Sequence, residues 1–176
     1  SDCRFGGGIS MKVDGDKLYF ISTRVKDAHL MSLNISGEIK EELVIDGSVD
    51  CFDVKDGNIY FVAMKDGKLQ EIYKKTETVE QLTKLNETVL SDKYVAAYEE
   101  VNFENDGWDF KGWVLLPKDY DPTKKYPAIL DIHGGPKTVY GTTFYHEMQL
   151  WANMGYFVFF TNPRGGDGRG NEFLDI

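Results

Sequence analysis

The amino-acid sequence predicts a mixed β and α/β chain with two halves of different fold. Residues 1–90 contain a repeat of about 40 residues built from short apolar runs and Gly/Asp turns. Residues 91–176 open with a predicted hairpin and continue with an apolar strand, a helical pattern and a second apolar strand. An α/β domain with a parallel sheet begins in this order. We therefore expect two domains, 1–90 and 91–176.

The repeat in the first domain consists of two pairs of matching segments. Val13–Ile21 (VDGDKLYFI) and Val54–Val62 (VKDGNIYFV) match 41 positions apart, and His29–Leu33 and Lys68–Ile72 match 39 positions apart. A period near 40 residues with short strands is typical of four-stranded β-propeller blades, so we predict two blades. An unrelated pair of β-meanders is the alternative. Two blades cannot by themselves close a ring of about four to eight.

Each repeat contains a hydrophobic strand, a polar turn and a second, alternating strand. Apolar runs bounded by Gly and Asp are the basis of this assignment. The predicted strands are Leu18–Ser22 and Leu30–Leu33 in the first repeat and Ile59–Ala63 and Leu69–Tyr73 in the second, with turns over 24–28 and 65–67.

The second domain begins with a predicted hairpin. Tyr94–Phe103 alternates between apolar and polar residues, and Trp108–Leu116 follows the sequence Asn-Asp-Gly at 105–107. Asn, Asp and Gly between two such runs favour a tight hairpin turn. Pro117–Pro127 is polar and contains proline at both ends, which indicates an irregular connection.

A strand, a helix and a further strand follow this connection. Ala128–Ile132 is a short apolar run and predicts a strand. Phe144, Met148 and Trp151 recur at helical spacing, and Gly155 is a plausible helix stop. Tyr156–Thr161 is almost continuously apolar, as expected for a strand that is buried on both faces of a sheet.

The first candidate functional segment is His133-Gly134-Gly135-Pro136, directly after the predicted strand. Glycines at this place let backbone N–H groups approach a ligand closely. A His-Gly-Gly turn after a buried strand forms part of an oxyanion hole in α/β-hydrolases. The alternative is a tight turn that needs glycine for its backbone conformation, with a packed His133.

The second candidate segment is the glycine-rich loop from Asn162 to Gly170, which contains Arg164. It does not fit a dinucleotide site, because Gly166-x-Gly168 is followed by Asn171 where glycine or alanine is required. We expect Arg164 to cross-link loops or to face a substrate carboxylate.

No catalytic nucleophile is found in the second domain. Residues 92–176 contain neither Ser nor Cys, and Gly-x-Ser-x-Gly occurs nowhere in the chain. The three histidines, His29, His133 and His146, are too scattered to predict a metal site, and no cofactor is expected.

Composition excludes several classes of protein. Twenty Lys and Arg against 29 Asp and Glu give a net charge of −9, which argues against nucleic-acid binding. The longest apolar stretch, Met154–Thr161, is far shorter than the roughly 20 residues of a membrane helix, so no membrane partner is expected. No signal peptide is visible at the N-terminus. These observations predict a cytoplasmic protein.

The order of these features resembles the prolyl oligopeptidase family (S9) of serine peptidases, in particular its acylaminoacyl-peptidase and dipeptidyl-peptidase branches. The similarity covers nearly the whole chain, and only the series of motifs together is specific. The segments that carry it are the blade-like repeats, then Leu82–Glu87, Asn105–Pro117, Tyr126–Ala128, His133–Pro136 and Asn162–Gly165.

The resemblance implies the last two blades of a β-propeller followed by the N-terminal half of an α/β-hydrolase domain, with short peptides as substrates. The turn at 133–136 looks like the family's second oxyanion-hole element. Some members use the backbone N–H at the position of Gly135, and others use a tyrosine at the position of His133. Gly166 stands where the family usually has serine, and Arg169 where an aromatic residue is common.

The family's catalytic Ser, Asp and His all follow strands that this chain does not reach, so His133 is not the expected triad histidine. We therefore expect an internal fragment of a serine peptidase that is inactive on its own. The alternatives are another α/β-hydrolase, such as an esterase, or a non-catalytic propeller interaction module. Open sheet edges predict that the isolated chain associates with itself.

Overall fold

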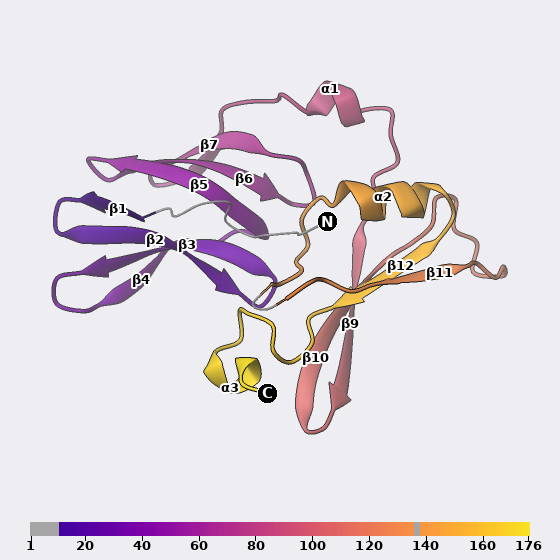
Figure 1. Cartoon of the computed structure of the whole chain (residues 1–176). Coiled ribbons are helices and arrows are strands. Elements are labelled where there is room, and N and C mark those ends of the chain that lie inside the picture. The colour runs from indigo at the N-terminus through magenta and orange to yellow at the C-terminus, as the bar shows by residue number, and fades with distance from the viewer. Residues whose placement is uncertain (1–10, 136–137) are drawn as a thin grey trace. The chain divides into compact units, whose positions relative to one another are not determined.

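The computed structural model describes residues 11–135 and 138–176, which form two compact units (Figure 1). Of the described residues, the blade unit contains Met11–Thr88 together with Gly141–Thr143. The sheet–helix unit contains Val89–Tyr140 and Phe144–Ile176. A four-residue helix, α1 (Glu87–Leu90), lies where the chain passes from one unit to the other.

Eight strands form the blade unit as two consecutive antiparallel meanders. A single parallel bridge, between Ala28 and Ser48, joins the two meanders. Each meander has the four strands of a propeller blade. The strands of the first are β1 (Met11–Asp14), β2 (Lys17–Arg24), β3 (Asp27–Asn34) and β4 (Ile39–Leu43), and those of the second are β5 (Gly47–Lys55), β6 (Asn58–Lys65), β7 (Glu71–Lys75) and β8 (Val79–Gln81).

The matching repeats of the sequence occupy matching places in the two meanders. The predicted strands at 18–22, 30–33 and 59–63 lie inside β2, β3 and β6. The turn predicted over 24–28 is shorter than expected, because Arg24 and Asp27 already pair across a two-residue turn. The strand predicted over 69–73 is displaced, since β7 begins at Glu71.

One hydrophobic core is shared by both blades. Phe61 of β6 and Tyr73 of β7 stack with their ring centroids 5.2 Å apart. The turn of the second repeat is also held by the first blade, since the Asp14 carboxylate accepts a hydrogen bond from the backbone N–H of Gly57 at 3.0 Å. The buried core residues are Tyr19, Leu30, Leu43, Ile45, Val49, Val54, Ile59, Phe61, Ala63 and Tyr73.

Where the chain leaves the second blade, several hydrogen bonds converge on the carboxylate of Glu71. This side chain is only 4% exposed. Its carboxylate accepts from the Thr83 hydroxyl at 2.5 Å, from the backbone N–H of Leu85 at 3.0 Å and from that of Asn86 at 2.9 Å. The hydroxyl and the N–H groups favour the charged form and lower the pKa of Glu71 to about 2.

Four strands form the mixed sheet of the sheet–helix unit, in the order β11-β12-β10-β9. Strands β11 and β12 are parallel, and the other neighbours are antiparallel. The bounds of the elements are β9 (Tyr98–Asn105), β10 (Trp108–Leu115), β11 (Ala128–Asp131), α2 (His146–Asn153), β12 (Phe157–Thr161) and α3 (Asn171–Leu174).

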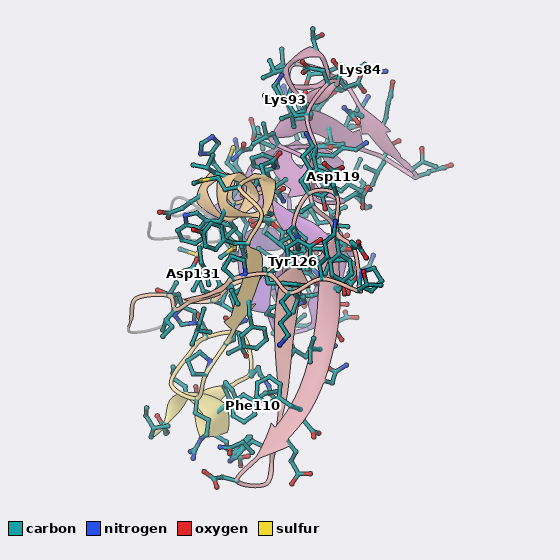
Figure 2. All side chains as sticks on the ribbon, turned by 90° about the vertical axis from the view of Figure 1, so that its right-hand side faces the viewer. Lys84, Lys93, Phe110, Asp119, Tyr126 and Asp131 are labelled. Carbon is teal, nitrogen blue, oxygen red and sulfur yellow. The ribbon has the colours of Figure 1, made fainter. Side chains whose placement is uncertain are left out.

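The predicted hairpin is confirmed, and its turn is the tight one that the sequence favours. Asp106 and Gly107 have φ values of 50° and 73°, so both central residues are left-handed, as a type I′ turn requires. The first strand starts at Tyr98 and not at Tyr94 as predicted. In Figure 2, Phe110 lies on this hairpin and Asp131 at the end of β11.

Helix α2 covers one face of the sheet, and the main core of this unit lies between them (Figure 1). The core consists of Ala96, Trp113, Leu115, Tyr140, Met148, Ala152, Val158 and Phe160. On the outer strand, Leu130 is 58% exposed. The far edge of β11 pairs with no other strand of the described chain. Self-association through such edges stays a prediction.

The segment before β9 is held by a side chain of α2 in place of a strand. The buried Gln149 amide accepts from the backbone N–H of Ala96 at 2.7 Å and donates to its carbonyl at 3.0 Å. This pair of bonds satisfies both polar groups of a residue that is itself buried. Among the described residues, no helix is long and apolar enough to cross a membrane.

The Gln149→Leu substitution should remove both of these bonds and leave the Ala96 backbone unsatisfied in the core. We expect the free energy of unfolding to fall by about 2–4 kcal/mol, measured by urea denaturation. The neighbouring Leu150→Gln is the matched control, because Leu150 is 49% exposed, and it should change stability by less than about 1 kcal/mol. Equal effects of the two variants would contradict this role for Gln149.

The free energy of unfolding should depend on pH through the carboxylate of Glu71. The folded pKa lies below the ordinary value of 4.5, so the stabilisation by the carboxylate is complete above about pH 4.5 and is lost as the pH falls towards 2. Glu71→Gln should therefore be less stable than the original chain at pH 7, and this difference should shrink between pH 4.5 and 2 in urea denaturation. Glu80→Gln, on an exposed strand, is the control and should keep the original pH dependence.

Candidate functional site

The two candidate segments meet at one edge of the sheet. The turn at His133–Gly135 follows β11, and the loop at Asn162–Gly170 follows β12. Because these strands are parallel neighbours, their carboxyl ends lie side by side. This is the edge of an α/β sheet at which ligands bind. Pro136 was also predicted to belong to the site and lies outside the described residues.

The imidazole of His133 is folded back onto its own turn. Its Nδ1 lies 2.8 Å from the carbonyl oxygen of Gly134. The ring packs edge-on against Tyr140, with centroids 5.0 Å apart and planes at 67°. Its Nε2 is buried and has no hydrogen-bond partner among the described residues.

The two glycines of the turn are exposed, in contrast to the inward-facing imidazole. Neither has a φ in the left-handed region. A Cβ added to Gly135 would meet no atom within 4 Å. Neither backbone conformation nor crowding among the described residues therefore demands glycine at 135.

Asn162 organises this edge, and the sequence analysis assigned it no role. Its side chain is buried and bonds both backbone groups of Tyr140: Oδ1 accepts from the N–H at 2.6 Å, and Nδ2 donates to the carbonyl at 2.8 Å. A polar amide directly after a buried apolar strand was the available signal, because buried amides need hydrogen-bond partners.

The loop after β12 lies behind His133. A Cβ on Gly166 would lie 3.0 Å from the carbonyl oxygen of Pro163, 3.3 Å from that of Thr138 and 3.9 Å from Nε2 of His133. The Gly166 N–H donates to Pro163 at 3.1 Å. A glycine at 166 therefore lets this loop close tightly against the turn.

Arg164 contacts the residue that follows α3 and a ring of the hairpin. One Nη donates to the carbonyl of Asp175 at 3.0 Å, and the guanidinium lies 5.1 Å from the centroid of the Trp108 ring. Arg169 acts in parallel, since it donates to the carbonyl of Asp109 and lies 4.2 Å from the ring of Phe173. Both arginines thus tie the last loop to the β9–β10 hairpin.

The described part of the chain contains no set of side chains that could bind a metal ion. No group of three or more His, Cys, Asp or Glu residues there could hold a metal ion. Residues 92–176 also lack Ser and Cys, so this half of the chain supplies neither a serine nor a cysteine nucleophile. The edge can therefore offer backbone hydrogen-bond donors but no serine or cysteine nucleophile.

Comparison with known proteins identifies related peptidases. A model of the prolyl oligopeptidase family matches residues 142–176. An uncharacterized peptidase of Bacillus subtilis, YuxL, is 41% identical over 91 residues, which are 48% of this chain and 14% of that protein. A probable dipeptidyl-peptidase 5 of Aspergillus niger is 35% identical over 81 residues, or 44% of this chain and 11% of that protein.

The fold is also found in a solved structure. An acylaminoacyl peptidase of Pyrococcus horikoshii matches with a TM-score of 0.85 and 27% identity, over 94% of this chain and 26% of that one. The chain thus spans about a seventh or less of the curated relatives and about a quarter of the solved enzyme.

The predicted fold class is confirmed by this match: β-propeller blades precede part of an α/β-hydrolase domain. The motif series in the sequence, the family match and the solved structure agree with one another. This chain thus resembles peptidases of the prolyl oligopeptidase family.

Proposed function

We propose that this chain is part of a serine peptidase that hydrolyses short peptides, of the acylaminoacyl-, dipeptidyl- or oligopeptidase type. The observation that carries the proposal is the exposed turn at Gly134 and Gly135, at the carboxyl end of β11 and beside the loop after β12. The similar proteins named as peptidases support it. The blades that precede the sheet favour a peptidase over an esterase or a non-catalytic module.

The turn would act on the negative charge that develops during acyl transfer. In a serine peptidase, a serine attacks the peptide carbonyl, a histidine takes the serine's proton, and an aspartate orients the histidine. The carbonyl oxygen becomes an oxyanion that needs hydrogen-bond donors. The backbone N–H of Gly135 is the donor that this chain supplies, and one such donor contributes roughly 3 kcal/mol of transition-state stabilisation.

The catalytic serine, aspartate and histidine belong, in this proposal, to sequence outside these 176 residues. Without a nucleophile and a base, a positioned donor cannot form an acyl-enzyme. Substrate specificity would also depend on that sequence, together with the remaining propeller blades.

The purified chain should not hydrolyse aminoacyl- or dipeptidyl-p-nitroanilides. The same chain, extended by the sequence that follows it in its gene, should hydrolyse them and should be inactivated by diisopropyl fluorophosphate. Release of p-nitroaniline, followed by absorbance, measures both. The proposal fails if the 176 residues alone show fluorophosphate-sensitive hydrolysis, or if the extended protein neither hydrolyses these substrates nor becomes labelled on a serine.

The role of the turn can be separated from its effect on folding with Gly135→Ala. Because nothing lies within 4 Å of the added Cβ, stability should change by less than about 1 kcal/mol. The kcat/KM of the extended enzyme should fall at least about tenfold, since the methyl group occupies space where substrate approaches. Gly107→Ala is the matched contrast: its φ of 73° makes alanine unfavourable, so it should lose about 1 kcal/mol or more of stability and keep its kcat/KM. The reverse pattern would contradict the role of the turn.

A further inference from the structure

We propose that Lys26 and Asp46 of the blades form a latch that holds Thr142, and that through this latch the folded blades stabilise the segment that leads into α2. The latch is a conformational device and does not depend on the proposed peptidase reaction. Every contact that forms it lies within the blade unit, to which Gly141–Thr143 belongs although this segment is part of the second half of the sequence.

The first observation is a set of hydrogen bonds around Thr142. The Lys26 ammonium donates to the Thr142 hydroxyl at 3.2 Å, and this hydroxyl donates to Oδ1 of Asp46 at 2.8 Å. The ammonium also donates to Oδ1 of Asp46 at 2.5 Å and to Oδ1 of Asp27 at 3.1 Å. A lysine has three N–H donors, so these three oxygens can occupy all of them. The hydroxyl fits between the two charged groups because it accepts from one and donates to the other.

The second observation is that part of this network is shielded from solvent. The side chain of Lys26 is 23% exposed and that of Asp27 is 15% exposed. An isolated ion pair on an open surface contributes little to stability, whereas charge-assisted hydrogen bonds that share a partly buried network are stronger. Asp46 is the most exposed member, and it receives a bond from both Lys26 and Thr142. The bonds to Thr142 are therefore strong enough to hold this residue in place.

The third observation is that the blade side of the latch is held independently of Thr142. The backbone N–H of Gly47 donates to Oδ1 of Asp27 at 2.9 Å, and the carbonyl of Asp46 accepts from the N–H of Asp66 at 3.0 Å. A Cβ added to Gly47 would lie 2.0 Å from the carbonyl oxygen of Met64, so the chain runs tightly against β6 at this point. Both carboxylates thus belong to well-fixed backbone.

The fourth observation is a strained turn next to Lys26. Val25 has a φ of 50° in the two-residue turn between Arg24 and Asp27. The Lys26 N–H donates to the carbonyl of Arg24 at 2.5 Å, so Val25 is the central residue of a γ-turn. A left-handed conformation is an outlier for a β-branched residue and persists only where surrounding contacts maintain it. The three contacts of the Lys26 ammonium supply such a constraint.

The fifth observation is the short length of the segment that carries Thr142. Tyr140 and Phe144 flank this segment, and both are buried in the sheet–helix unit. The backbone of Tyr140 is also fixed by the Asn162 amide. The chain from Tyr140 to Phe144 spans at most about 14 Å when fully extended, so Thr142 can move only a little while both flanks stay packed. Unfolding of the blades removes the partners of Thr142, and the segment then loses these bonds together with the blades.

The test asks whether the stability of the sheet–helix unit depends on the blades through the Thr142 hydroxyl. All three tryptophans, Trp108, Trp113 and Trp151, lie in the sheet–helix unit, so their fluorescence reports its unfolding in urea. Val49→Ala weakens the blade core, in which Val49 is fully buried. In the original chain this substitution should lower the urea midpoint of the tryptophan transition by about 0.5 M. In the Thr142→Val background the same substitution should shift the midpoint by less than half as much.

Two further variants control for the loss of a hydroxyl. Thr142→Ser keeps the hydroxyl and should keep the full response to Val49→Ala. Thr123→Val also removes a hydroxyl that donates to an aspartate, but that bond joins Thr123 to Asp121 at 2.7 Å within one turn, so the response should be unchanged. An undiminished response in Thr142→Val, or no response in the original chain, would overturn the proposal. If Val49→Ala unfolds the blades without urea, Ile59→Val is the milder substitution in the same core.

Hydrogen exchange of the 176-residue chain provides the second readout. The backbone amides of residues 141–144 should exchange at least about tenfold faster in Thr142→Val and in Lys26→Met than in the original chain, because either change breaks the latch. Thr123→Val should leave these rates unchanged. Equal rates in the original chain and both latch variants would overturn the proposal, and if Lys26→Met does not fold, Thr142→Val and Thr142→Ser still decide it. Neither readout requires peptidase activity, so the failure of the proposed function and the failure of the latch are distinguishable.

Discussion

The pairing of β12 with β11 on one side and β10 on the other is the constraint on which the rest of the sheet–helix unit depends. The parallel pair places the carboxyl ends of β11 and β12 at one edge, where the turn and the glycine-rich loop meet. The antiparallel pair connects this edge to the hairpin, to which Arg164 and Arg169 tie the loop. Helix α2 can then pack on the face that carries Trp113 and Phe160.

Two buried side-chain amides form hydrogen bonds with backbone groups that lie outside the strands. Gln149 bonds both backbone groups of Ala96, and Asn162 bonds both backbone groups of Tyr140. In each case an amide side chain makes the two bonds that a neighbouring strand would otherwise make. Such bonds satisfy backbone groups that would be costly to bury unpaired, while the chain remains free to turn. Next to the candidate site, these bonds fix the backbone of Tyr140.

The elements that depend on local residue patterns could be predicted from the sequence. The two blades, the left-handed Asp106–Gly107 turn and the buried strand at β12 follow from repeats, turn residues and apolar runs. The errors arose where a distant group took part. The start of the hairpin was predicted four residues early, because alternation continues through Ala96 while its hydrogen bonds go to Gln149. The segment at 69–70 was predicted as strand, although pairing begins only at Glu71.

The sequence by itself determined the resemblance to the prolyl oligopeptidase family, the order of the two halves and the absence of Ser and Cys from the second half. These properties are carried by residue identity and local spacing. Only the tertiary structure decided that the His133 ring points inward and the two glycines lie exposed, and that Asn162 holds Tyr140 against the ring. Those contacts join segments that are far apart in sequence, and their partners are selected by strand pairing and burial. The residue pattern of a single segment therefore does not predict these contacts.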